Sequence, residues 1–213
     1  MKGLFKTLLV CTGIVVSIAS CTKDPTDNLT AEESRVYITQ RDTSADFTSY
    51  STFYIPDSVS LVKGNKEVKE LSNIDTAYIN ATSRYMTAAG YTQTTDSSKA
   101  DLGVNINRIY NIYTGYYSYG GYWGGYGGYW DPGYYWGLGG YGYGYPGFVG
   151  TYYITDVSIS INILDLKNAK TNKTINLLWL GSINGSGVAN NNNPSIADSQ
   201  VGKLFAQSTY LKK

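Results

Sequence analysis

The feature that most constrains the fold is a strict alternation of apolar and polar side chains from Val157 to Ile163. Valine or isoleucine stands at every second position, with serine or asparagine between. A period of two sends the two sets to opposite faces of a β-strand, and β-branched residues favour strands. Residues 165–173 (DLKNAKTNK) then predict a hairpin connection, and Ile175, Leu177 and Trp179 begin the predicted return strand. The chain is therefore expected to build an antiparallel sheet.

Three further segments have strand character. Residues 35–40 and 51–55 are rich in β-branched and aromatic side chains. Leu102, Val104 and Ile106 alternate with Gly103, Asn105 and Asn107, which predicts a half-buried strand with its polar side chains in solvent. Residues 57–71 are charged and show no clear periodicity, so no regular element is predicted there.

Two helices are predicted. Ser72 and Asp75 have the spacing of a capping box, and Gly90 suits a left-handed helix stop. A second helix is expected from about Pro194, with Asn193 as its cap. Each has one apolar face; the stripes are Ile74, Tyr78, Ala81, Tyr85 and Ala88, and Ala197, Val201, Leu204, Phe205 and Ser208. This order predicts an α+β two-layer sandwich, with a mainly antiparallel sheet and two helices on one face.

The amino-terminal segment has the pattern of a secretory signal. Residues 1–6 carry two lysines and no acid, residues 7–18 are mostly apolar, and small residues precede Cys21. The apolar run is shorter than the roughly 20 residues that a membrane-spanning helix needs. We therefore expect a signal peptide over residues 1–20, a polar tether over 21–34, and a single domain over 35–213.

Ile18-Ala19-Ser20-Cys21 resembles the lipobox of bacterial lipoproteins. The resemblance implies diacylglycerol on the Cys21 sulfur and cleavage before this residue, so that the membrane is reached through a lipid anchor. Thr22 stands where an acidic residue would signal retention in the inner membrane, which favours the outer membrane of a Gram-negative envelope. Which leaflet carries the anchor is left open.

Residues 113–147 form a long insertion of glycine, tyrosine and tryptophan whose only charged residue is Asp131. Such low complexity is typical of a mobile or self-associating segment. Aromatic rings can also stack on sugars, so envelope glycan is a second candidate partner. Nucleic acid is disfavoured, because the insertion has no Lys or Arg to pair with phosphates. The candidate aromatic binding surface consists of Tyr116, Tyr117, Tyr122, Trp123, Tyr126, Tyr129, Trp130, Tyr134, Tyr135 and Trp136.

The composition excludes several kinds of chemistry. The chain has no histidine, and its two cysteines are Cys11 within the signal and Cys21. Cys/His zinc sites and Ser-His-Asp triads are thus excluded, and we expect neither a metal nor a cofactor. A hydrolase using paired carboxylates is the remaining catalytic alternative, and its candidate residues are Glu32, Glu33, Asp75, Asp101 and Asp131. Asp75 and Asp101 have simpler structural explanations, as a helix-start and a strand-start residue.

Several segments together resemble the bacterial lipoprotein family called domain of unknown function 4136. They are residues 46–53 (DFTSYSTF), residues 100–105 (ADLGVN), and residues 164–182, which include NAKTNK and LWLGS. Leu180 precedes Gly181 where a basic residue is common in the family. The resemblance implies an envelope lipoprotein without an assigned activity. The sequence therefore predicts a non-catalytic, lipid-anchored binding or structural protein that acts through its aromatic insertion.

Overall fold

The computed structural model describes residues 28–63, 66–110, 115–118, 149–152, 157–172, 174–190 and 192–213, with backbone only for 66, 67, 115–118, 149–152 and 170. Arg35–Lys213 forms one compact unit and Met1–Ser34 another. Every described strand and helix, and the whole buried core, belongs to Arg35–Lys213, so we expect this unit to fold alone. Among the described residues, no helix is both long and apolar enough to cross a membrane.

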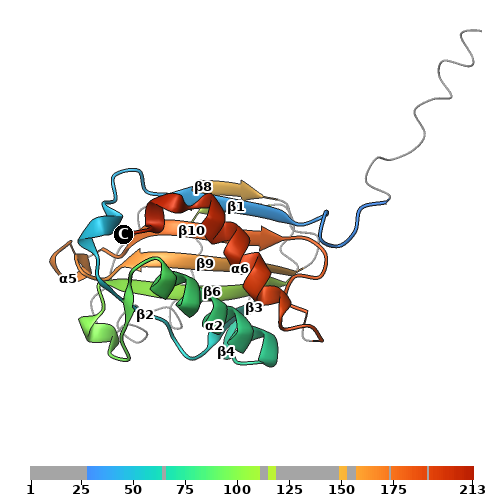
Figure 1. The fold of residues 1–213 in the computed structure, drawn as a ribbon, viewed down its shortest axis with the longest axis horizontal. Helices are drawn as coiled ribbons and strands as arrows, with labels where there is room; N and C mark the ends of the chain where they lie inside the picture. The colour runs from blue at the N-terminus through green and yellow to red at the C-terminus, as the bar shows by residue number, and fades with distance from the viewer. Residues whose placement is uncertain are drawn as a thin grey trace, which may run out of the picture. The chain divides into compact units, whose positions relative to one another are not determined.

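An eight-stranded sheet forms the centre of this unit (Figure 1). Its strands are β1 (Val36–Arg41), β2 (Thr52–Tyr54), β3 (Val59–Lys63), β4 (Lys66–Glu70), β5 (Thr92–Gln93), β6 (Leu102–Tyr110), β9 (Val157–Asp165) and β10 (Asn176–Asn184). The main path is β1-β10-β9-β6-β2-β5; β3 also pairs with β6, and β4 with β3. The pairs β1–β10, β10–β9, β9–β6 and β3–β4 are antiparallel, whereas β2–β5, β2–β6 and β3–β6 are parallel. The sheet is thus mixed.

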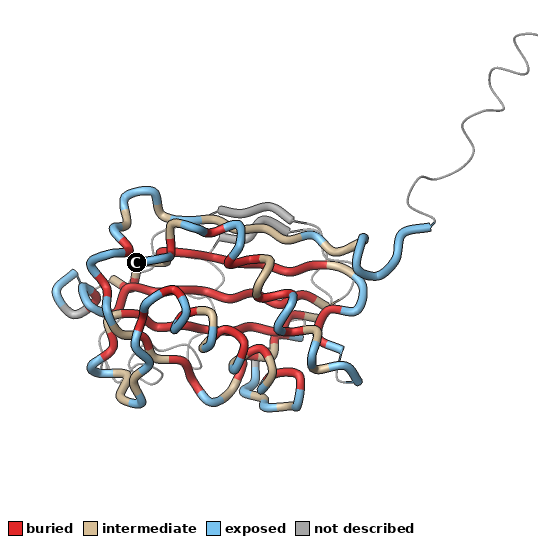
Figure 2. Tube along the Cα trace, viewed as in Figure 1, coloured by how far each residue is buried: buried red, intermediate tan, exposed pale blue. Residues whose placement is uncertain are grey.

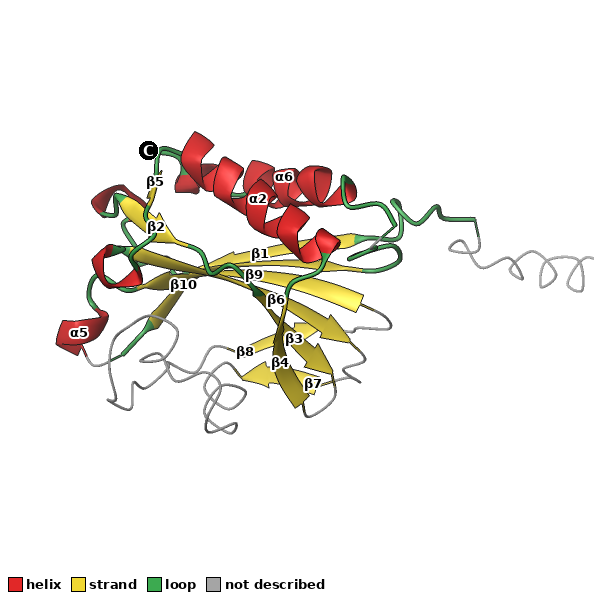
Figure 3. Ribbon diagram, turned by 90° about the horizontal axis from the view of Figure 1, so that it is seen from below, coloured by secondary structure: helices red, strands yellow, loops and turns green. Residues whose placement is uncertain are grey.

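Helices α2 (Asn73–Ala88) and α6 (Ile196–Gln207) lie together on one face of the sheet (Figure 3). A short helix, α5 (Ala169–Asn172), lies in the β9–β10 connection, and the single turns are η1 (Phe47–Ser49), η2 (Ser97–Lys99) and η3 (Thr209–Leu211). Strands β7 (Gly115–Ser118) and β8 (Val149–Tyr152) form a separate antiparallel pair, drawn on the side of the sheet away from α2 and α6 (Figure 3). The predicted α+β class, with two helices on one face, is confirmed.

The ends of α2 follow the sequence signals. The Ser72 side chain accepts from the Asp75 amide, and the Asp75 carboxylate accepts from the Ser72 amide at 2.8 Å, which completes the capping box. Gly90 has a φ of 102°, the left-handed region expected of a helix stop. Helix α6 begins two residues later than predicted. Its cap is Ser195 rather than Asn193, whose Oδ1 instead accepts from the Ser195 hydroxyl at 2.7 Å.

The charged segment 57–71 holds a hairpin, β3–β4, that the sequence pattern did not predict. Val59 and Val62 are buried, and β3 pairs with β6 through Ser60 to Lys63. Strand β4 pairs only with β3 among the described strands, and its sequence is KEVKE. Charged edge strands discourage pairing with other chains. The same charges hide the apolar period that strand prediction relies on.

The prediction of a half-buried strand over residues 102–107 was wrong, because both faces of β6 are buried, as are those of its neighbour β9 (Figure 2). The polar face continues onto β10: Asn107 and Ser182 both lie opposite Ser160 in the register. Along each strand one polar side chain donates to the next; the pairs are Asn105–Asn107, Ser160–Asn162 and Ser182–Asn184. These bonds satisfy polar groups removed from water. Alternation shows which residues share a face but not whether that face is covered.

Candidate functional site

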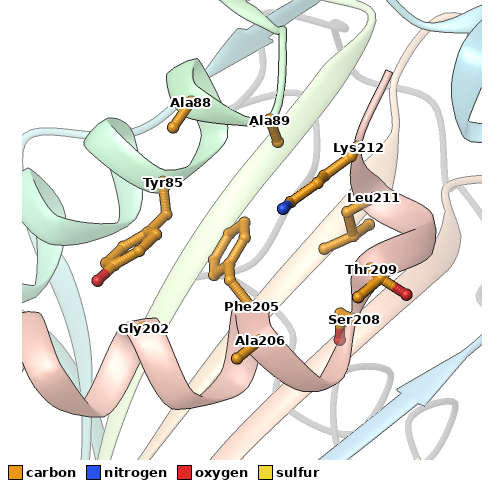
Figure 4. Close-up of a pocket in the computed structure, with 10 residues that line it drawn as sticks. All are labelled: Tyr85, Ala88, Ala89, Gly202, Phe205, Ala206, Ser208, Thr209, Leu211 and Lys212. Atoms are coloured by element: carbon orange, nitrogen blue, oxygen red, sulfur yellow. The ribbon is translucent and has the colours of Figure 1, made fainter.

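A groove of about 490 Å³ opens between the carboxyl-terminal ends of α2 and α6 and the turn η3 (Figure 4). Cavities of about 300–1,000 Å³ are typical of small-molecule sites. Residues from α2 and the position after it form one side, residues from α6 the other, and η3 closes one end. The lining residues are Tyr85, Ala88, Ala89, Gly202, Phe205, Ala206, Ser208, Thr209, Leu211 and Lys212.

Small residues create the groove where the two helices approach. A Cβ atom on Gly202 would lie 3.0 Å from Cζ of Tyr85 and closer still to its hydroxyl, so glycine is what allows the ring to lie against α6. The Tyr85 and Phe205 rings are stacked, with centroids 5.5 Å apart. Ala88 and Ala206 are exposed and too small to fill the space between the helices. The walls are therefore apolar and partly aromatic.

The floor of the groove is buried and rigidly supported. Phe205 packs on Trp179 with ring centroids 5.6 Å apart, and the Trp179 indole donates to the Ser208 hydroxyl at 2.9 Å. Leu211 is also buried. The amide of Lys213 donates to the carbonyl of Ala89 at 3.0 Å, which ties the segment after η3 to the end of α2. These contacts hold the groove open without a ligand.

One cation stands at the groove. Lys212 is exposed, and its side chain extends across the mouth towards Phe205 (Figure 4). Lys212 forms none of the ion pairs found among the described residues. Arg84 of α2, which is not among the lining residues, instead pairs with Asp198 of α6 and lies 4.5 Å from the centre of the Tyr85 ring. The site thus combines an apolar trough with a single ammonium group.

A buried charged cluster lies at the other end of α2. Arg108 of β6 is 3% exposed, and its Nη2 lies 3.1 Å from both Asp75 and Glu70. Asp75 is fully buried and also caps α2. The cluster therefore joins β4, β6 and α2, and every member has a role in holding the fold.

Of the acidic residues considered for catalysis, Asp75 and Asp101 each hold parts of the fold together. Asp101 accepts from the amides of Ser51 and Thr52, at 2.6 and 3.2 Å, and so joins the start of β6 to β2. Asp75 is committed to the buried cluster. Glu33 is exposed, and its hydrogen bonds from the amide and hydroxyl of Thr30 lower the pKa of its carboxyl. Glu32 is its exposed neighbour, and Asp131 lies outside the described residues.

The remaining predicted site residues lie outside the described part of the chain or have only their backbone described. Cys21 and eight of the ten aromatic residues lie outside it. Tyr116 and Tyr117 belong to β7, of which only the backbone is described. Both the lipid anchor and the aromatic binding surface consequently stay predictions.

Sequence reasoning missed the groove. Tyr85, Ala88 and Phe205 were assigned to the core faces of their helices, yet Tyr85 is only half-buried and Ala88 is exposed. A faint signal existed: each predicted helix ends in small residues, Ala88-Ala89 in one and Gly202 with Ala206 in the other. Two helix ends that are too small to fill the space between them leave a trough.

Comparison with solved structures identifies a similar protein from Bacteroides thetaiotaomicron VPI-5482, described as a DUF4136 family protein. It is 27% identical, with a TM-score of 0.67, over 84% of this chain and 98% of that one. A PelC variant from Paraburkholderia phytofirmans, solved as a dodecamer, is 7% identical with a TM-score of 0.39, over 81% and 96% of the two chains. Among curated proteins, none matches this chain. A family model matches residues 38–208, and the chain accordingly belongs to the family described as Domain of unknown function (DUF4136).

Proposed function

We propose that this protein is a lipid-anchored envelope protein whose folded unit is a non-catalytic binding module. The observation that carries the binding role is the preformed groove of about 490 Å³, with apolar walls and one cation at its mouth. The anchoring role is supported by the signal pattern and by the lipobox-like segment that ends at Cys21.

The positions of the acidic residues Asp75 and Asp101 support a non-catalytic function. A pair of catalytic carboxylates has to face one substrate across a gap of about 5 to 9.5 Å. Asp75 and Asp101 instead accept hydrogen bonds from backbone amides at the starts of α2 and β2. A screen of Arg35–Lys213 against ester, amide and glycoside substrates should show no turnover; turnover that Asp75→Asn or Asp101→Asn abolishes would favour the hydrolase alternative.

Fatty-acid labelling in a Gram-negative host tests the anchor. The full chain should incorporate an alkyne-tagged palmitate and fractionate with the outer membrane, because two or more acyl chains hold a protein stably on a bilayer. Cys21→Ser should lose the label and release the protein from the membrane fraction, while Cys11→Ser should keep both. Equal labelling of the Cys21→Ser chain would refute the anchor.

The aromatic insertion remains a second proposed contact surface, for envelope glycan or for other copies of the chain. Its composition of glycine, tyrosine and tryptophan, without Lys or Arg, is what motivates it. Deleting Tyr116–Tyr145 should leave the free energy of unfolding unchanged and should abolish pull-down on peptidoglycan or self-association. A deletion that unfolds the protein would assign the insertion to the core instead.

A further inference from the structure

We propose that the groove between α2, α6 and η3 binds a single-chain amphipathic anion, specifically a long-chain fatty carboxylate. The alkyl chain would lie along the trough between the helices, and the carboxylate would pair with the ammonium group of Lys212. This inference rests on the proposed binding function and names its ligand class.

The apolar part of the ligand is inferred from the walls. Around the trough lie the stacked Tyr85 and Phe205 rings, the methyl groups of three alanines and the Leu211 side chain. The Ser208 hydroxyl on the floor is turned away from the trough and accepts from the Trp179 indole (Figure 4). A polar ligand would find few partners along this surface, whereas a methylene chain gains from leaving water.

The anionic head is inferred from charge complementarity. Lys212 directly follows η3, and its side chain extends across the mouth of the groove (Figure 4). Two neighbouring cations are otherwise engaged: Arg84 pairs with Asp198, and Lys213 lies over the Tyr91 ring. The one acidic residue of α6 is Asp198, and it pairs with Arg84. At the mouth of the groove an anionic head therefore meets an ammonium group that forms none of the described ion pairs.

Two helices end at this groove, and helix carboxyl ends repel anions. The structure reduces that effect at α2, because its last carbonyls already accept hydrogen bonds from the amides that follow. The pairs, donor first, are Ala89–Tyr85, Tyr91–Met86, Gly90–Thr87 and Lys213–Ala89. Each helix terminus acts as about half a charge, and its influence falls off within one turn. The full positive charge of Lys212 at the mouth exceeds the partial negative charge that remains at the helix ends.

The size of the site fits one chain rather than a bilayer surface. The trough has a volume of about 490 Å³ and is bounded by η3 at one end. The large exposed apolar side chains of the unit, Val36, Val68 and Leu71, lie on β1, β4 and the β4–α2 connection, not at the groove. A broad apolar rim for insertion into a membrane is not present around it in the described residues.

Titration of Arg35–Lys213 with three amphiphiles of equal chain length tests the inference. Dodecanoate, dodecanol and dodecylammonium are added below their micelle-forming concentrations, and binding is followed by displacement of a fluorescent fatty-acid analogue. We expect dodecanoate to bind once per chain, about tenfold more tightly than dodecanol, and dodecylammonium to bind least. No saturable binding, or equal affinities for all three heads, would overturn the proposal.

Variants locate the ligand. Lys212→Ala should lower dodecanoate affinity about tenfold, to the level of dodecanol, and leave dodecanol unchanged. Lys99→Ala removes an exposed lysine of η2 that is not among the lining residues of the groove, and as the control it should change neither affinity. Ala206→Trp and Ala88→Trp each fill the trough from an exposed position, so both should abolish binding while circular dichroism stays native.

The outcomes separate the inference from the proposed function. Dodecanoate binding that survives both tryptophan variants, or that is insensitive to Lys212→Ala, overturns the groove assignment. That result leaves the Cys21 labelling experiment and the insertion deletion as independent tests of the anchored binding module. If no fatty carboxylate binds but a hydrophobic peptide does bind at the groove, the proposed ligand class is overturned and the binding function is retained.

Discussion

Replacing Gly181 by alanine tests whether the core on the helix-covered face of the sheet is packed so tightly that it leaves no room for a side chain at this position. Gly181 is on β10, two residues after Trp179 and on the same face of the sheet. A Cβ atom at this position would lie 2.8 Å from Leu204 Cδ1 and 3.0 Å from Trp179 Cζ2, and it would overlap Cη2 of the same indole. Carbon atoms in contact are normally about 3.5–4.0 Å apart. The indole must therefore move.

The expected cost follows from what holds the indole. Trp179 is fully buried, packs on Phe205 and donates to Ser208. Overpacking of a buried site costs about 1–3 kcal/mol. Weakening the indole hydrogen bond adds about 0.5–1.5 kcal/mol. We expect Gly181→Ala to lower the free energy of unfolding by about 2–4 kcal/mol, measured by urea denaturation of Arg35–Lys213 with far-ultraviolet circular dichroism as the probe.

A double-mutant cycle with Trp179→Leu makes the reasoning specific. Trp179→Leu alone is destabilising because it leaves a cavity, and the added methyl group of Gly181→Ala then has room. The two costs should therefore be less than additive by more than about 0.5 kcal/mol, the usual scatter for independent sites. Additive effects, or a Gly181→Ala cost below about 0.5 kcal/mol, would refute the packing argument. Ser182→Ala, on the opposite face of the same strand, controls for strand propensity.

Three further predictions use the same denaturation assay. Arg108→Met should cost about 3–5 kcal/mol, because it leaves the buried Asp75 carboxylate without its cation; Arg84→Ala, in an exposed pair, should cost at most about 1 kcal/mol. Gly90→Ala should cost about 1–2 kcal/mol, since a φ of 102° strains any residue with a Cβ atom. Burial raises the pKa of Tyr91 from 10.0 to about 12, so its contribution to stability is complete below pH 10 and is lost as the pH rises towards 12. Tyr91→Phe should flatten this alkaline loss, and an unchanged slope would contradict it.

The elements that could be predicted are those in which local chemistry and tertiary role agree. The alternation of β9, the capping pair Ser72 and Asp75, and the glycine stop at Gly90 each encode their structure within a few residues, and each is confirmed. The period of 3.6 decides which side of a helix is apolar, and the predicted core face of α6 is confirmed. On α2 the predicted stripe is confirmed for Ile74, Tyr78 and Ala81, but Tyr85 is only half-buried and Ala88 is exposed. The family resemblance, resting on segments from residue 46 onward, is confirmed by the match over residues 38–208.

What could not be predicted depends on distant partners. The parallel pairing of β2 and β3 with β6 joins segments about 50 residues apart, and nothing in either segment specifies the other. The burial of Asn105, Ser160 and Ser182 depends on what covers their face, which alternation does not contain. Arg108 gave no signal in the sequence, because its ion partner Asp75 looks complete as a helix cap.

The groove depends both on local residue choice and on partners that are distant in the sequence. A search for chemical motifs would therefore not find it. Its residues come from positions 85–89 and 202–212, which lie more than 100 residues apart, and none has the reactive character that marks a catalytic site. The structural signature is a deficit: alanine and glycine stand where two packed helices would ordinarily interlock larger side chains. Such a deficit normally destabilises a core. Here it lies at the exposed end of the helix pair beside an available lysine, where a ligand rather than the protein itself can fill it.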